Sequence, residues 1–95
     1  MEEVIASLIT RAEELLSKRK ELDALEVAVS AYAYRESGVL MPPAEALGYL
    51  KSRFPGEELV SRAEAIIKRS EEAGDIRGTV EILLAILRDD DFAEF

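Results

Sequence analysis

Two pairs of carboxylates, each spaced three residues apart, are the side chains of this 95-residue sequence best suited to chemistry. Asp23 stands three residues before Glu26, and Glu72 stands three residues before Asp75. This spacing puts both acids of a pair on one helix face, and Mg²⁺ binds where several oxygen ligands converge. The same spacing is typical of a helix start, where an acid caps free N–H groups. We interpret both pairs as helix starts, and we expect no metal site and no cofactor.

The acid pairs also resemble those of all-α nucleotide pyrophosphatases of the MazG type, which hold Mg²⁺ against the phosphates of their substrate. The resemblance implies a small metal-dependent nucleotide hydrolase, and this is one alternative function. No Lys or Arg of the sequence is spaced to hold the phosphates in such a site. Capping therefore remains the favoured interpretation of the spacing.

Nucleophilic catalysis lacks its usual partners in this chain. There is no His and no Cys, so a hydroxyl nucleophile has no imidazole base and no thiolate is available. A Ser–Lys arrangement stays open, although no motif indicates one. The Gly residues stand singly, so no Gly-rich loop is present to bind phosphate. We predict no catalytic residue and favour a protein that is not an enzyme.

Basic residues gather in two short clusters, one made of Lys18, Arg19 and Lys20 and the other of Lys68 and Arg69. Together they could form one small patch for nucleic acid, which would make the chain a nucleic-acid-associated accessory subunit. The formal net charge is -8, whereas nucleic-acid binders usually carry a basic face. We favour solvated helix ends that interact with their own helix dipole.

The last residues, Asp89-Asp90-Asp91-Phe92-Ala93-Glu94-Phe95, are the most individual feature. Three acids at a helix C-terminus oppose the helix dipole, so we expect the last helix to end near Arg88. The prediction is a single helical domain over 1–88 and an acidic-aromatic tail over 89–95. The tail resembles the acidic tip of bacterial single-stranded-DNA-binding proteins, which implies that Phe92 and Phe95 contact a partner. The alternative is that both rings fold back onto the helical domain.

Composition indicates a soluble protein of the cytoplasm. The sequence is 48% hydrophobic and 34% charged, and no apolar run reaches the ~18 residues that cross a bilayer. The start, Met1-Glu2-Glu3-Val4, is acidic, unlike a secretory signal. Asn, Gln and Cys are all missing, and hyperthermophile proteins avoid these heat-labile residues. We therefore predict a thermophilic source.

Apolar residues recur at helical spacing nearly throughout, which predicts five helices. We expect them over about 2–19, 23–37, 42–54, 57–73 and 75–88. Asp23 and Asp75 are the predicted caps, Gly38 the residue that ends the second helix, and Pro42-Pro43 the start of the third. One continuous helix through residue 36 is an alternative, because neither Gly nor Pro interrupts that stretch. The two halves of the sequence also resemble each other, as an internal duplication would produce.

These helices predict an all-α fold, a four- or five-helix bundle built from antiparallel αα-hairpins. The second and fifth helices are apolar on most sides, so both are expected to be central or covered by another subunit. Tyr32 and Tyr34 lie about 200° apart around the second helix, at 100° per residue, and one ring is expected to face a partner. The favoured function is a non-catalytic protein-interaction module, an adaptor or accessory subunit, that forms a homodimer and binds a protein partner.

Overall fold

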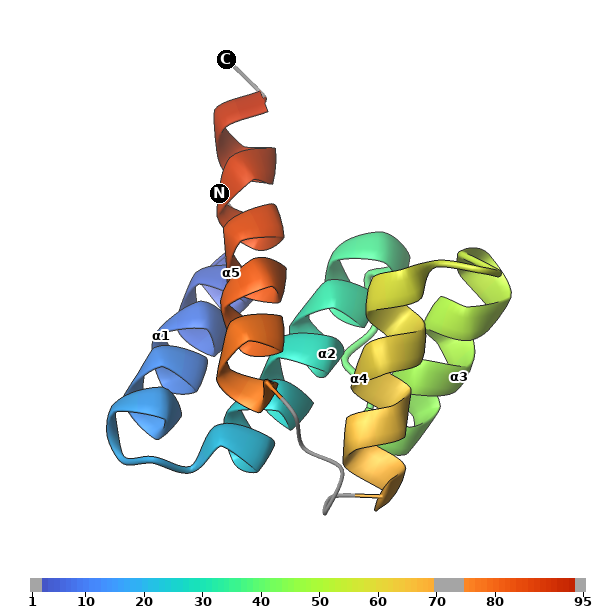
Figure 1. Ribbon diagram of the computed structural model, residues 1–95. Helices are drawn as coiled ribbons and strands as arrows, with labels where there is room; N and C mark the ends of the chain where they lie inside the picture. The colour runs from blue at the N-terminus through green and yellow to red at the C-terminus, as the bar shows by residue number, and fades with distance from the viewer. Residues whose placement is uncertain (1–2, 70–74, 94–95) are drawn as a thin grey trace.

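The computed structural model describes residues 3–69 and 75–93, and these fold into five α-helices with no strand (Figure 1). The all-α class predicted from the sequence is confirmed. The helices and their bounds are α1 (Glu3–Ser17), α2 (Glu21–Ser37), α3 (Pro43–Arg53), α4 (Glu58–Arg69) and α5 (Ile76–Ala93).

Helix α2 lies at the centre of the fold and packs against each of the other four helices, most extensively against α1. Its residues from Val29 to Ala33 are all buried, which agrees with a helix that is apolar on most sides. Helix α5 packs more extensively against α2 than against α4. The contacts therefore do not establish the second of the two expected hairpins.

The chain breaks between α1 and α2, so the continuous helix is wrong. Arg19 has a φ of 63°, in the left-handed region that favours Gly. The N–H of Arg19 donates to the carbonyl of Leu16 at 3.0 Å, and the N–H of Lys20 donates to that of Leu15 at 2.8 Å. These two bonds are the Schellman arrangement that ends a helix.

Two of the predicted helix-end residues perform their roles. The backbone N–H of Gly78 donates to the Asp75 carboxylate at 2.9 Å, which caps the start of α5. Gly78 has no Cβ, and an added Cβ would overlap that carboxylate. Gly38 ends α2 with a φ of 79°, and its N–H donates to the carbonyl of Tyr34.

Three expectations about helices are corrected. Asp23 is not a cap, because α2 begins at Glu21 and the preceding residue, Lys20, makes no side-chain capping bond. Helix α5 continues beyond Arg88 to Ala93, because its intrahelical hydrogen bonds continue despite the acids at its end. Helix α5 is also peripheral: Ile82 is 44% exposed, while Val80, Leu83 and Leu84 are buried.

Candidate functional site

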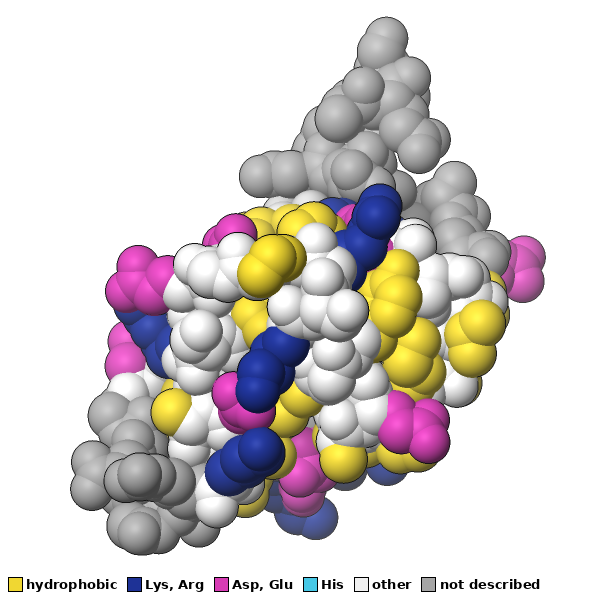
Figure 2. Space-filling model, turned by 90° about the vertical axis from the view of Figure 1, so that its right-hand side faces the viewer, with side chains coloured by type: hydrophobic (Ala, Val, Ile, Leu, Met, Phe, Trp, Pro, Cys, Tyr) yellow, Lys and Arg dark blue, Asp and Glu magenta, His cyan; other side chains and the backbone are white. Residues whose placement is uncertain are grey.

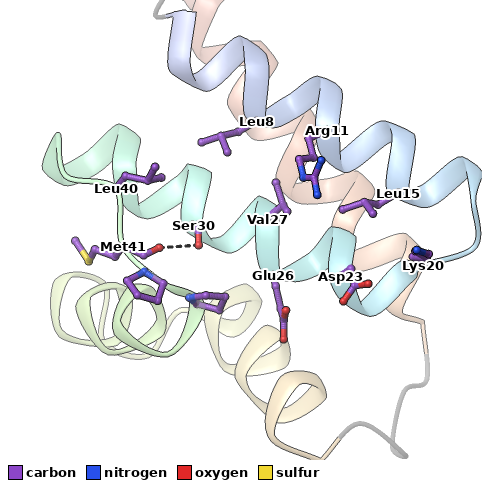
Figure 3. A pocket seen from close by; sticks show the side chains of 12 residues that line it. Leu8, Arg11, Leu15, Lys20, Asp23, Glu26, Val27, Ser30, Leu40 and Met41 are labelled. Atoms are coloured by element: carbon purple, nitrogen blue, oxygen red, sulfur yellow. Dashed lines mark hydrogen bonds between the residues drawn. The ribbon is translucent and has the colours of Figure 1, made fainter.

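An apolar hollow of the described residues lies between α1, α2 and the segment that joins α2 to α3. It has a volume of about 580 Å³. We call it the α1–α2 groove, and Figure 3 shows it from close by. Its lining residues are Leu8, Arg11, Leu15, Lys20, Asp23, Glu26, Val27, Ser30, Leu40, Met41, Pro42 and Pro43.

Helix α1 supplies one wall of the groove from a second apolar stripe. Its main stripe, Ile5, Ile9, Ala12 and Leu16, is buried in the core. Leu8 and Leu15 lie seven residues apart, on a shared face beside that stripe, and both are only partly buried. In Figure 3 both side chains extend from α1 toward α2. The apolar surface of α1 is therefore wider than the part that the core covers.

Helix α2 and the segment that follows it form the side of the groove opposite α1. Val27 points up from α2 into the groove, and Ser30 lies one turn further along (Figure 3). The Ser30 hydroxyl donates to the carbonyl oxygen of Met41 at 2.9 Å, which ties that segment to α2. Leu40, on the rim, is 57% exposed. Val39 and Leu40 follow Gly38, and both side chains are largely exposed.

The positive and the negative residues of the groove lie on different sides of it. Arg11 and Lys20 belong to α1 and the turn after it, whereas Asp23 and Glu26 belong to α2 (Figure 3). None of these four forms an ion pair within the described part of the chain. Every described Lys or Arg side chain beyond residue 20 does form one; these are Arg35, Lys51, Arg53, Arg62, Lys68, Arg77 and Arg88.

A second hollow of about 580 Å³ adjoins the groove and shares Glu26, Pro42 and Pro43 with it. It extends between α3 and α4, where the Glu64 carboxylate contacts Lys51 at 2.9 Å and Lys68 at 3.1 Å. Hydrogen bonds from these two ammonium groups lower the pKa of Glu64 below its ordinary value. Apart from Glu26, which it shares with the groove, the charged residues that line this second hollow are thus paired within the chain.

The two tyrosines predicted to meet a partner occupy different places. Tyr32 is 8% exposed and its ring stacks on that of Phe54, with the centroids 5.7 Å apart. The Arg35 guanidinium lies 5.0 Å from the same ring, and burial raises the pKa of Tyr32. Because the fold itself covers Tyr32, this ring offers a partner almost no surface. Tyr34 is partly buried against the core.

The structure does not join the basic clusters into one patch. Lys18, Arg19 and Lys20 are exposed at the α1–α2 turn, whereas Lys68, on α4, pairs with Glu64. Figure 1 shows the α1–α2 turn and the end of α4 well apart. On the face shown in Figure 2, basic side chains are interleaved with acidic and apolar ones. The side chain of Arg69 lies outside the described residues.

Few structural details are described for the remaining predicted site residues. The described residues contain no group of three or more His, Cys, Asp or Glu placed to hold a metal ion. Glu72 and Phe95 lie outside the described residues, and for Phe92 only the helical backbone is described. Within the described ranges, no helix combines the length and the apolarity needed to span a bilayer.

The groove was not predicted, because helical spacing alone does not separate Leu8 and Leu15 from the buried stripe of α1. The available signal was the width of the apolar surface on α1, together with the exposed pair Val39 and Leu40 after Gly38. Comparisons with protein-family models, with curated proteins and with solved structures gave no match.

Proposed function

We propose that the chain is a non-catalytic protein-interaction module that binds a polypeptide in the α1–α2 groove. The observation that carries the proposal is the uncovered face of α2, flanked by apolar side chains from α1 and from the α2–α3 segment. An apolar groove between helices is a common docking site for an amphipathic segment of another protein. Exposed apolar surface rimmed by charges also favours an interface.

A polypeptide fits this groove better than a small molecule does. Small-molecule sites place a few polar groups deep in a concave pocket to orient the ligand. Here the hydroxyl of Ser30, a buried polar side chain of the groove, is already bonded to the Met41 carbonyl. Arg11, Lys20 and Asp23 are exposed, and there they would contact side chains of a bound protein.

Site-specific photo-crosslinking tests the proposal. A benzophenone amino acid replaces Val27 in the groove, and the matched control carries it at Ser61, an exposed α4 residue outside the groove. The full-length chain is irradiated in the cells that express it. We expect a polypeptide adduct from position 27 and none from position 61. Equal yields at both positions, or no adduct at position 27, would contradict the proposal.

We further propose that the module works in the cytoplasm of a thermophile. The lack of Asn, Gln and Cys supports resistance to heat. A thermal melt followed by circular dichroism is expected to show unfolding above the roughly 45–65 °C range of mesophilic domains. A reversible transition near about 50 °C would contradict the thermophilic origin.

A further inference from the structure

We infer that the polypeptide bound in the α1–α2 groove is a second copy of this chain, related to the first by a two-fold axis that runs along the groove. The inference rests on the proposed function and names the partner of the same site. Tyr32 is no longer a predicted dimer contact, because it is covered within its own chain, and Tyr34, which is partly buried, does not line the groove.

A two-fold interface must be self-complementary. Each copy presents the same surface, so a feature on one side of the axis meets the partner's feature from the other side. With the axis along the groove, the α1 wall of one copy faces the α2 and α2–α3 side of the other. A groove whose two walls carried charges of one sign could not pair in this way.

The apolar and charged residues on the two sides of this groove follow one another in a matching order. Along α1 toward the turn, Figure 3 shows Leu8, then Arg11, then Leu15 and Lys20. In the same direction on the other side it shows Leu40, then Glu26, then Asp23. The apolar end of one wall thus meets the apolar end of the other, and each cation meets a carboxylate.

The four charged residues of the groove are available to pair between copies. Within the described part of the chain, Arg11, Lys20, Asp23 and Glu26 form no ion pair. Two cations and two carboxylates on one surface balance each other. A second copy therefore brings the complementary charges, and its exposed Leu40 reaches the apolar end of the groove.

Charge reversal on each side separately tests the inference. The first variant carries Arg11→Glu and Lys20→Glu, and the second carries Asp23→Lys and Glu26→Lys. Sedimentation equilibrium of the full chain at micromolar concentration is expected to give a dimer for the wild type. Each variant alone places like charges opposite one another, so we expect its dimer to be at least about 100-fold weaker. Ser61→Lys, which adds a charge outside the groove, should stay dimeric.

Mixing the two variants is the decisive measurement. In a mixed dimer the two introduced glutamates of the first variant face the two introduced lysines of the second. The unchanged charges of the two chains also face each other, so both sets attract. Native mass spectrometry of an equimolar mixture should show one chain of each variant. Circular dichroism verifies that each variant is folded.

Other results would overturn the inference. A monomeric wild type removes the second copy as partner. If both variants stay dimeric, or if the mixture stays monomeric, the copies do not meet through these charges. The proposed function is judged separately by the position-27 crosslink: an adduct with a different protein would keep the module and reject the self-association.

Discussion

Helix α1 borders two hollows, and the charged residues that line them differ in how they are paired. On one side the α1–α2 groove leaves Arg11, Lys20, Asp23 and Glu26 without ion pairs within the described residues. On the other side a cleft of about 480 Å³ separates α1 from α5. This α1–α5 cleft is bridged by an ion pair between Arg88 and Glu13 and by an Arg77 hydrogen bond to the Leu16 carbonyl at 3.3 Å.

The difference separates charges that connect helices of one chain from charges that remain available. In the cleft, Arg77 also lies 3.4 Å from Glu81 and 3.9 Å from Glu21, so its charge is satisfied within the fold. In the groove, exposed apolar groups accompany charges that have no ion pair among the described residues, a combination typical of interfaces. A hollow between helices is therefore a better docking candidate when its rim charges are unpaired.

The largest expected effect comes from the same Leu→Ala change in each hollow. Leu84 lines the cleft and is 2% exposed, whereas Leu40 lines the groove and is 57% exposed. Leu84→Ala should lower the free energy of unfolding by about 2–5 kcal/mol, because it leaves a cavity. Leu40→Ala should change it by less than about 0.5 kcal/mol. Urea unfolding, at a concentration where the chain is monomeric, measures both; similar losses would remove the contrast.

A smaller effect distinguishes the two aspartates that the sequence treats alike. Asp75 caps α5, one wall of the cleft, while Asp23 lines the groove and caps nothing. Asp75→Ala should cost about 1 kcal/mol of stability because the Gly78 N–H loses its acceptor. Asp23→Ala should cost only a few tenths, about the contribution of an exposed first-turn acid to the helix dipole. Denaturant midpoints of the two variants give the comparison, and equal costs would contradict the capping assignment.

The ion pairs of the cleft should contribute less to the free energy of unfolding than the Asp75 cap does. Glu13→Gln removes the carboxylate partner of Arg88, and since both side chains are about half exposed the cost is about 0.2–1 kcal/mol. Arg11→Gln, in the groove, removes no pair within the described chain and should leave the monomer's stability unchanged. The Glu13→Gln deficit should shrink in about 1 M salt, which screens exposed charges. A deficit that is independent of salt would mean that Glu13 acts through packing.

The smallest effect concerns the paired carboxylate between α3 and α4. Lys51 and Lys68 lower the pKa of Glu64 from 4.5. A lowered pKa means that the ionised carboxylate stabilises the fold above pH 4.5, and that this contribution is lost as the pH falls through the lowered value. Unfolding of the wild type and of Glu64→Gln should therefore differ near neutral pH and converge in acid.

A carboxyl-carbon NMR titration checks the cause of that shift. In Lys68→Met the pKa of Glu64 should move back toward its ordinary value, because one of the two ammonium donors is gone. An unchanged titration in this variant would show that the Lys68 contact does not influence the carboxylate in solution.

The sequence by itself determined the class of the fold and most of the helix ends. Helical spacing of apolar residues is a local property, and so are the effects of Pro42-Pro43 and Gly38 and the capping by Asp75. The end of α1 was located only by its polar stretch, because the left-handed residue there is Arg19 rather than Gly. The end of α5 was placed too early, since a charge effect of a few tenths to about 1 kcal/mol does not end a helix.

Only the tertiary structure decided which surfaces are covered. Leu8 and Leu15 on α1 and Val27 on α2 have the same apolar chemistry as core residues, but no helix of the described chain covers the groove that they line. Likewise Tyr32 is buried because Phe54, 22 positions later, stacks on it. Which charges pair was also open, because Glu64 and Glu26 look alike in sequence while only Glu64 meets two lysines among the described residues. Periodicity shows where a helix is apolar, but packing between distant segments decides what covers that surface.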